Sequence, residues 1–146
     1  MIDVSRSNHI LGVARKSKVL ALKLNPNNKK YAEDMFLLGI LHDIGYEFTK
    51  NHEDHSRIGG EILKRANYNY WEEVSLHGDD CVENMSDELF LLNYADMTTG
   101  TNGEDVSFKE RLDEIANRFG AKSSAYKKCV KVIERLKLDT RSDSIK

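Results

Sequence analysis

The chain has few of the residues that break helices or cross-link a fold. It has one proline and two cysteines in 146 residues. So little proline favours helices over a turn-rich sheet protein, and the Val, Ile, Thr and aromatic runs that are typical of strands are missing. Cys81 and Cys129 form no Cys-x-x-Cys pattern, which indicates two reduced thiols in a cytosolic protein rather than a disulfide framework. We expect an all-α fold.

Long apolar segments and a strong excess of one charge are missing too. No apolar stretch approaches the roughly 18 residues that a membrane span needs, and the N-terminus lacks the order of basic, apolar and small residues of a signal peptide. The net charge is -2, and the basic residues near the C-terminus are interleaved with acidic ones, which is typical of a solvated helix face. We therefore expect a cytoplasmic protein that binds neither membranes nor nucleic acid.

The chain length, with 40% hydrophobic residues, fits one compact domain over residues 1–146. Apolar residues at helical spacing and their flanking cap residues predict a bundle of six to seven helices. We expect these helices at residues 5–24, with Ser5 as the cap, and then at 29–44, 55–66, 71–77, 86–96, 107–120 and 126–136. The second of them is apolar nearly all round and is the expected central buried element. We expect a helical core over 5–139, a surface loop at 98–105 and a frayed C-terminus at 140–146.

The most informative feature is the doublet His42-Asp43. The seven apolar residues 35–41 lead directly into this imidazole and carboxylate. A buried charge needs a partner, and a buried ring nitrogen needs a hydrogen bond or a metal ion. If a cation satisfies the doublet, other His and Asp residues should complete its coordination shell.

Six residues on expected inward faces or helix ends form such a metal-site inventory: His9, His42, Asp43, His55, His77 and Asp96. Imidazole and carboxylate ligands without thiolate suit Fe, Mn, Co, Zn or Ni better than Ca, and six candidates suit two ions better than one. Adjacent helical residues point about 100° apart, so the doublet fits two neighbouring ions with Asp43 as the bridge. Two-metal sites of this kind are suited to phosphate ester hydrolysis.

The order of these residues resembles the HD superfamily of metal-dependent phosphohydrolases, which is named for the doublet. Arg6-Ser7-Asn8-His9 is similar to the opening Arg-x-x-His of the family, and the segment 41–46 is similar to its core motif. Further motifs are similar to those of small stand-alone bacterial members of the family. These motifs are His55 with Gly59-Gly60, His77, Tyr94-Ala95-Asp96, and the segment that runs through Arg111-Leu112 to Arg118-Phe119-Gly120.

The resemblance implies an HD-like helical domain and a set of roles. His9, His42, Asp43 and Asp96 would be the core metal ligands, and His55 with His77 would add the ligands of a second ion. The implied cofactor is a pair of divalent ions (Fe, Mn, Co, Ni or Zn, with Mg as an alternative). A metal-bound hydroxide would attack phosphorus in a nucleotide or another small phosphoester, with Asp43 bridging the ions and Arg6 holding the phosphate oxygens.

Several alternatives stay open at this point. His52 could replace His55 as a ligand, and Thr98 or Thr99 could support the Asp96 carboxylate by a hydrogen bond. The Gly-Tyr-Pro signature of cyclic di-nucleotide phosphodiesterases is missing, and the residues after His77 and Asp96 depart from the diadenosine tetraphosphate hydrolase branch. The competing functions are a di-iron oxygenase on the same fold and a non-catalytic domain that binds metal or nucleotide. A homodimer is also left open.

Overall fold

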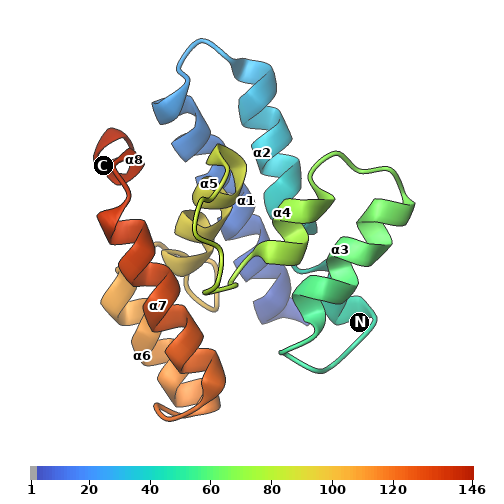
Figure 1. Ribbon diagram of the computed structural model, residues 1–146, viewed down its shortest axis with the longest axis vertical. Coiled ribbons are helices and arrows are strands. Elements are labelled where there is room, and N and C mark those ends of the chain that lie inside the picture. Colours follow the sequence, from blue (N-terminus) through green and yellow to red (C-terminus); the bar gives the residue numbers. More distant parts are fainter. Residues whose placement is uncertain (1–2) are drawn as a thin grey trace.

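A computed structural model describes residues 3–146 of the chain. Those residues form eight α-helices, six of them longer than one or two turns, with one 3-10 helix and no β-strand, which confirms the all-α prediction (Figure 1). In chain order the elements are α1 (Val4–Leu24), α2 (Lys29–Leu41), the 3-10 helix η1 (Ile44–Glu47), α3 (His55–Arg65), α4 (Trp71–Leu76), α5 (Asp87–Met97), α6 (Phe108–Phe119), α7 (Ser124–Leu138) and α8 (Arg141–Ser144).

Helix α5 is the central element of the bundle, and the prediction that the second helix has this place is wrong. Eight of the 11 residues of α5 are buried, and α5 contacts α1, α2, α4 and α7. On α2 the buried residues are confined to one face, and Leu37 is 46% exposed. The apolar run suggested burial all round, but Leu37 within it faces solvent while Met35 and Leu38 are buried.

The bundle has two arms that extend from this centre. Helices α6 and α7 form a hairpin on one side, and α3 with α4 forms a second pair on the other side (Figure 1). The packing of α7 on α5 joins the first pair to the core, and the packing of α4 on α5 joins the second pair to it. The fold therefore presents the ends of α1, α2 and α5 between two helix pairs.

Two helix boundaries differ from the sequence-based expectation. Asp3, rather than Ser5, caps α1 by accepting a hydrogen bond from the Arg6 amide at 2.8 Å. Helix α2 ends at Leu41, and the doublet lies in the turn that leads into η1. The helix ends early because the His42 ring donates its Nδ1 proton to the Gly39 carbonyl, which takes up an acceptor at the helix end.

The expectation of a frayed C-terminus is wrong. Residues 141–144 form α8, and Ser142 and Ile145 are buried. Arg141 holds this end by pairing with Asp139 at 2.7 Å and with Asp87 at 2.8 Å. The short polar segment carries no helical periodicity, so its order depends on contacts that are distant in sequence. None of the helices over residues 3–146 is long and apolar enough to cross a membrane.

Candidate metal centre

The structure brings together all six residues of the predicted metal-site inventory. They come from different elements: α1 supplies His9, the turn after α2 supplies the doublet, α3 begins at His55, His77 caps the C-terminal end of α4, and α5 supplies Asp96. Their exposed fractions range from 0% for His42 to 8% for His55. Segments far apart in sequence therefore deliver only imidazoles and carboxylates to one buried point.

Asp43 lies at the centre of the cluster. Its Oδ1 atom is 3.3 Å from Nε2 of His55 and 3.4 Å from Nε2 of His77. Its Oδ2 atom is 3.3 Å from Nε2 of His42 and 3.2 Å from Nη1 of Arg6. The two oxygens of one carboxylate thus face two different groups of nitrogens, which is the placement that a bridging ligand needs.

The second carboxylate serves the other side of the cluster. Oδ1 of Asp96 is 2.9 Å from Nε2 of His9 and 3.7 Å from Nε2 of His42. Two groups of three ligand atoms are close enough to hold an ion each: His9 with His42 and Asp96, and His42 with Asp43 and His77. Because His42 belongs to both groups, the two candidate ion positions are neighbours.

The four histidines share one orientation. Each directs Nδ1 to a backbone carbonyl, which accepts only, so Nδ1 carries a proton and Nε2 is the ring atom that faces the cluster. The carbonyl partners are Gly100 for His9 at 2.9 Å, Gly39 for His42 at 2.6 Å, His52 for His55 at 2.5 Å and Val74 for His77 at 2.5 Å. Metal-ligating histidines have this arrangement because the second hydrogen bond fixes the tautomer and the ring.

The surroundings of the His42 Nε2 atom fit a bound cation. His42 Nε2 is fully buried, and among the described residues it has no hydrogen-bond partner. Burial disfavours a charged imidazole, but Asp43 and Asp96 outweigh that effect and raise the pKa of His42 to about 10. Burial also opposes the ionised carboxylates, yet the surrounding imidazoles hold the pKa of Asp43 and of Asp96 well below the usual range. The site therefore demands a positive charge next to His42, from a proton or a metal ion.

Two glycines explain how α3 and α4 come close enough to place their histidines. A Cβ atom on Gly45 would lie 1.8 Å from the His55 carbonyl oxygen, and one on Gly60 would lie 2.5 Å from Cβ of Ser75. Glycine costs helix stability, so the Gly59-Gly60 pair in α3 needs a packing reason, and contact with α4 is that reason. The glycines let η1, α3 and α4 pack at backbone distance, which delivers His55 and His77 to Asp43.

His55, not His52, faces the other ligands. The Nδ1 atom of His52 accepts a hydrogen bond from the Tyr46 hydroxyl at 2.5 Å, and its ring lies against Phe119 with the centroids 4.4 Å apart. Burial, with the charges of His55 and Arg118, lowers the pKa of His52 to about 4, so this ring is neutral at pH 7. His52 lines the wall of a cleft next to the cluster.

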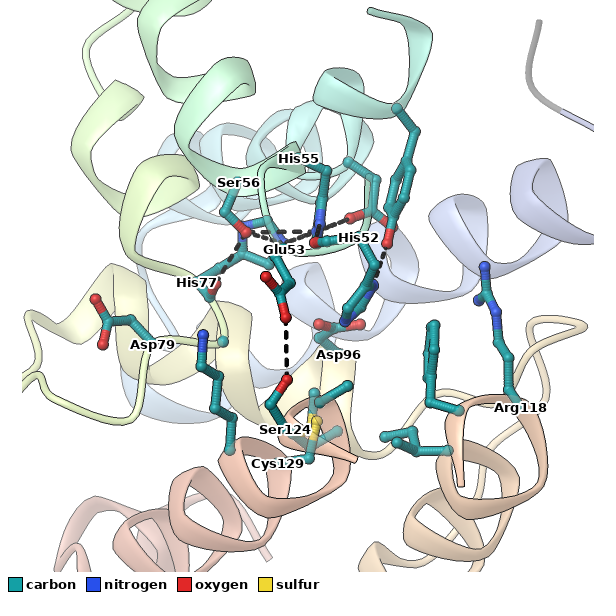
Figure 2. Close-up of a pocket in the computed structure, with 18 of the residues that line it drawn as sticks. His52, Glu53, His55, Ser56, His77, Asp79, Asp96, Arg118, Ser124 and Cys129 are labelled. Atoms are coloured by element: carbon teal, nitrogen blue, oxygen red, sulfur yellow. Dashed lines mark hydrogen bonds and ion pairs between the residues drawn. The ribbon is translucent and has the colours of Figure 1, made fainter. Parts of the chain in front are cut away.

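That cleft has a volume of about 370 Å3 and opens between the two helix pairs (Figure 2). The cluster forms its floor, and Glu53 and Ser124 meet across it through a 3.1 Å hydrogen bond. Arg6 also lines the cleft, with its guanidinium 3.8 Å from the Tyr46 ring centroid.

Sequence reasoning missed Arg111 and Arg118 as functional candidates, although both line the cleft. Nη2 of Arg111 is 3.7 Å from Oδ1 of Asp96. Their spacing of seven residues, two helical turns, was the signal that could have found them. The hypothesis that Thr98 or Thr99 supports Asp96 is wrong, because their hydroxyls donate to the carbonyls of Tyr94 and Ala95. Both threonines are buried, so their part of segment 98–105 is not a surface loop.

A family model described as HD domain matches residues 6–138. The chain belongs to the HD domain family. The matched range begins at Arg6 and contains the doublet and the rest of the cluster. No curated protein and no solved structure matches the chain significantly. As an HD domain, the chain has a buried His/Asp cluster that could bind metal, and such domains are typically metal-dependent phosphohydrolases.

Proposed function

We propose that this HD domain is a metal-dependent phosphohydrolase with a dinuclear centre. The observation that carries the proposal is the position of Asp43, whose two oxygens face His55 and His77 on one side and His42 with Arg6 on the other. One carboxylate with imidazole nitrogens next to both of its oxygens is the arrangement that two-metal hydrolases use. Its place at the floor of an open cleft gives a substrate access to it.

The cluster would hold two divalent ions of the Fe, Mn, Co, Ni or Zn type, or Mg as the alternative. His9, His42 and Asp96 would hold one ion, and His55 with His77 would hold the other. Asp43 would serve both ions, because its oxygens face His42 on one side and His55 and His77 on the other. Bound ions of this kind lower the pKa of water toward neutrality and offset the charge that develops on a phosphoryl group.

The chain's own residues bind and orient the reacting groups. The backbone carbonyls that accept from the four histidines fix the imidazole rings before a substrate arrives, which limits the reorganisation that the reaction requires. Arg6 lies on the cleft side of Asp43, and the Tyr46 ring supports its guanidinium. This planar group would bind two phosphate oxygens at once.

The shape and charge of the cleft favour a small substrate. A volume of about 370 Å3 lies at the lower end of the range for small-molecule sites. Acidic residues, Glu53, Asp79 and Asp80, line the same cleft as the arginines, and they would repel a long polyanion such as a nucleic acid. A nucleotide or another small phosphoester is the substrate class that fits.

The direct test is phosphate release by the purified, metal-loaded protein from a panel of nucleotides and nitrophenyl phosphate esters. Mn, Fe, Co, Ni and Mg are supplied separately. We expect turnover with at least one of these ions and a loss of at least roughly 100-fold in Asp43→Asn. Asp113→Asn, an exposed carboxylate on α6, is the matched control and should retain activity.

Loaded protein that hydrolyses none of these esters would contradict the proposal. If such a protein consumed oxygen in the presence of an organic substrate, the di-iron oxygenase hypothesis would take its place. Nucleotide binding without turnover of any kind would favour the non-catalytic alternative.

A further inference from the structure

Three arginines converge beside the metal cluster. Arg6 of α1 and Arg111 and Arg118 of α6 line a hollow of about 240 Å3, together with Asp3, Ser5, His9 and Thr101. The one carboxylate among these lining residues, Asp3, accepts a hydrogen bond from the Arg6 amide as the cap of α1. Because Arg111 and Arg118 are two helical turns apart, both lie on one face of α6. Arg118 extends from α6 toward α1, at the end of the cleft that is remote from Asp79 (Figure 2). The hollow therefore adjoins the cluster on the side of α1 and α6.

One of the three arginines in this hollow, Arg118, has no carboxylate partner within residues 3–146, whereas the other two do. Arg6 pairs with Asp43 at 3.2 Å, and Arg111 pairs with Glu114 at 3.3 Å and with Asp96 at 3.7 Å. No ion pair joins Arg118 to a carboxylate in the described part of the chain. The guanidinium of Arg118 instead lies 4.8 Å from the Phe119 ring centroid, which leaves its donors free for a ligand.

Metal binding would weaken the ion pairs of the other two arginines. Asp43 and Asp96, the partners of Arg6 and Arg111, are also the carboxylates that would hold the ions, and a carboxylate that binds a cation offsets less charge on a neighbouring arginine. Arg111 has in addition a buried Nε atom without a hydrogen-bond partner among the described residues. An anion between α1 and α6 would therefore meet donors that the protein itself does not satisfy.

We propose that Arg111 and Arg118, with Arg6 shared between both positions, form a second anion site for a phosphate group of the substrate other than the one at the metal cluster. The inference rests on the proposed function and narrows its substrate class to compounds with at least two phosphate groups. Guanidinium pairs suit phosphate because their planar donors match two of its oxygens. The acidic side of the cleft, at Glu53 and Asp79, then receives the uncharged part of the substrate.

The test compares two ligands that the protein cannot hydrolyse, methylphosphonate and methylenediphosphonate, with ethylenediphosphonate as a longer analogue. Their dissociation constants are measured by calorimetry on protein kept in excess Mn2+. The wild type should bind one of the diphosphonates about 10- to 100-fold more tightly than methylphosphonate, since the second group gains charge-assisted hydrogen bonds. In Arg118→Ala this preference should fall to within about threefold.

Two further variants complete the design. Arg57→Ala removes an exposed arginine that lines the same cleft on α3, and it should retain the preference. Arg111→Lys keeps the charge but loses the planar donors, and it should lower the preference, with the melting temperature measured to confirm the fold. Equal binding of mono- and diphosphonates by the wild type, or an unchanged preference in Arg118→Ala, would overturn the proposal. Because no ligand is hydrolysed, this result does not depend on whether the protein turns over phosphoesters.

Discussion

The Nε2 atoms of His55 and His77 lie 3.2 Å apart, although each ring has already donated its Nδ1 proton to a backbone carbonyl. Without an ion only a single proton can lie between these two nitrogens, whereas a shared cation would bind both of them. The Asp43 carboxylate lies within 3.4 Å of both nitrogens. This trio is the strongest geometric sign of a second metal position.

Replacing either histidine of this pair should reduce the metal content. We expect His55→Gln and His77→Gln to lower the content from about two ions per chain to about one, because the His9, His42 and Asp96 group remains. Elemental analysis of the purified variants measures the number of ions per chain. His52→Gln is the matched control, since His52 is turned toward Tyr46 and Phe119, and it should keep both ions. Loss of metal in the control alone would reverse the assignment of His52 and His55.

Metal binding should release a proton and tighten as the pH rises. The pKa of His42 in the metal-free protein is raised to about 10, so the ring is protonated below that pH and an incoming ion must displace the proton. The apparent affinity should then rise up to about tenfold per pH unit between pH 6.5 and 9. Calorimetry in buffers of different ionisation enthalpy should detect about one proton released. Affinity that is independent of pH in this range would show that His42 is already neutral.

The metal-free protein should lose stability at alkaline pH for the same reason. A pKa raised from 6.5 to about 10 in the folded state contributes stability that is fully present below pH 6.5 and is lost as the pH rises through 10. Chemical denaturation of the metal-free protein at several pH values should show this decline. Metal-loaded protein should show a smaller decline, because the ion replaces the proton.

The close packing of α3 on α4 should tolerate no side chain at Gly60. Gly60→Ala places a Cβ atom 2.9 Å from the Ser75 Cα atom, so the helices must separate at a cost of about 1–3 kcal/mol in the free energy of unfolding. Because His77 follows Ser75 on α4, the second ion should also bind more weakly. Glu61→Ala, at the exposed neighbouring position, should change stability by less than about 0.5 kcal/mol. Equal stabilities of the two variants would contradict the packing account.

The two free cysteines should differ in reactivity. Cys81 is exposed, whereas burial and the charge of Asp96 raise the pKa of Cys129 to about 11. Since only the thiolate reacts, a disulfide reagent at pH 8 should label Cys81 rapidly and Cys129 slowly. Cys81→Ser should remove the fast phase, and a fast phase that persists in this variant would contradict the burial of Cys129.

The sequence was sufficient to predict the helices and the members of the cluster. Imidazoles and carboxylates at the ends of apolar helix faces are uncommon, so they mark candidate ligands. The order of His9, the doublet and Asp96 along the chain also resembles one family. The choice between His52 and His55 needed coordinates, because these residues are one turn apart and only the packing at Gly45 decides which ring faces Asp43.

Other features depend on contacts that local patterns do not encode. Helix α8 forms because Arg141 reaches Asp87 on α5, 54 residues earlier in the chain. In the sequence Arg118 is indistinguishable from an ordinary exposed helix arginine, and only the packing of the fold places it in the same hollow as Arg6 of α1. The central position of α5 likewise follows from its four neighbouring helices rather than from its own hydrophobicity.

The central claim is that the cluster around Asp43 holds two metal ions. The most direct measurement is anomalous diffraction from crystals grown in Mn2+ or Zn2+. The account predicts two anomalous peaks, roughly 3.5–4 Å apart, one next to His9, His42 and Asp96 and one next to Asp43, His55 and His77. Crystals of metal-supplied protein with no peak at Asp43, or with ions only at the group formed by Asp79, Asp80 and the exposed Cys81, would contradict it.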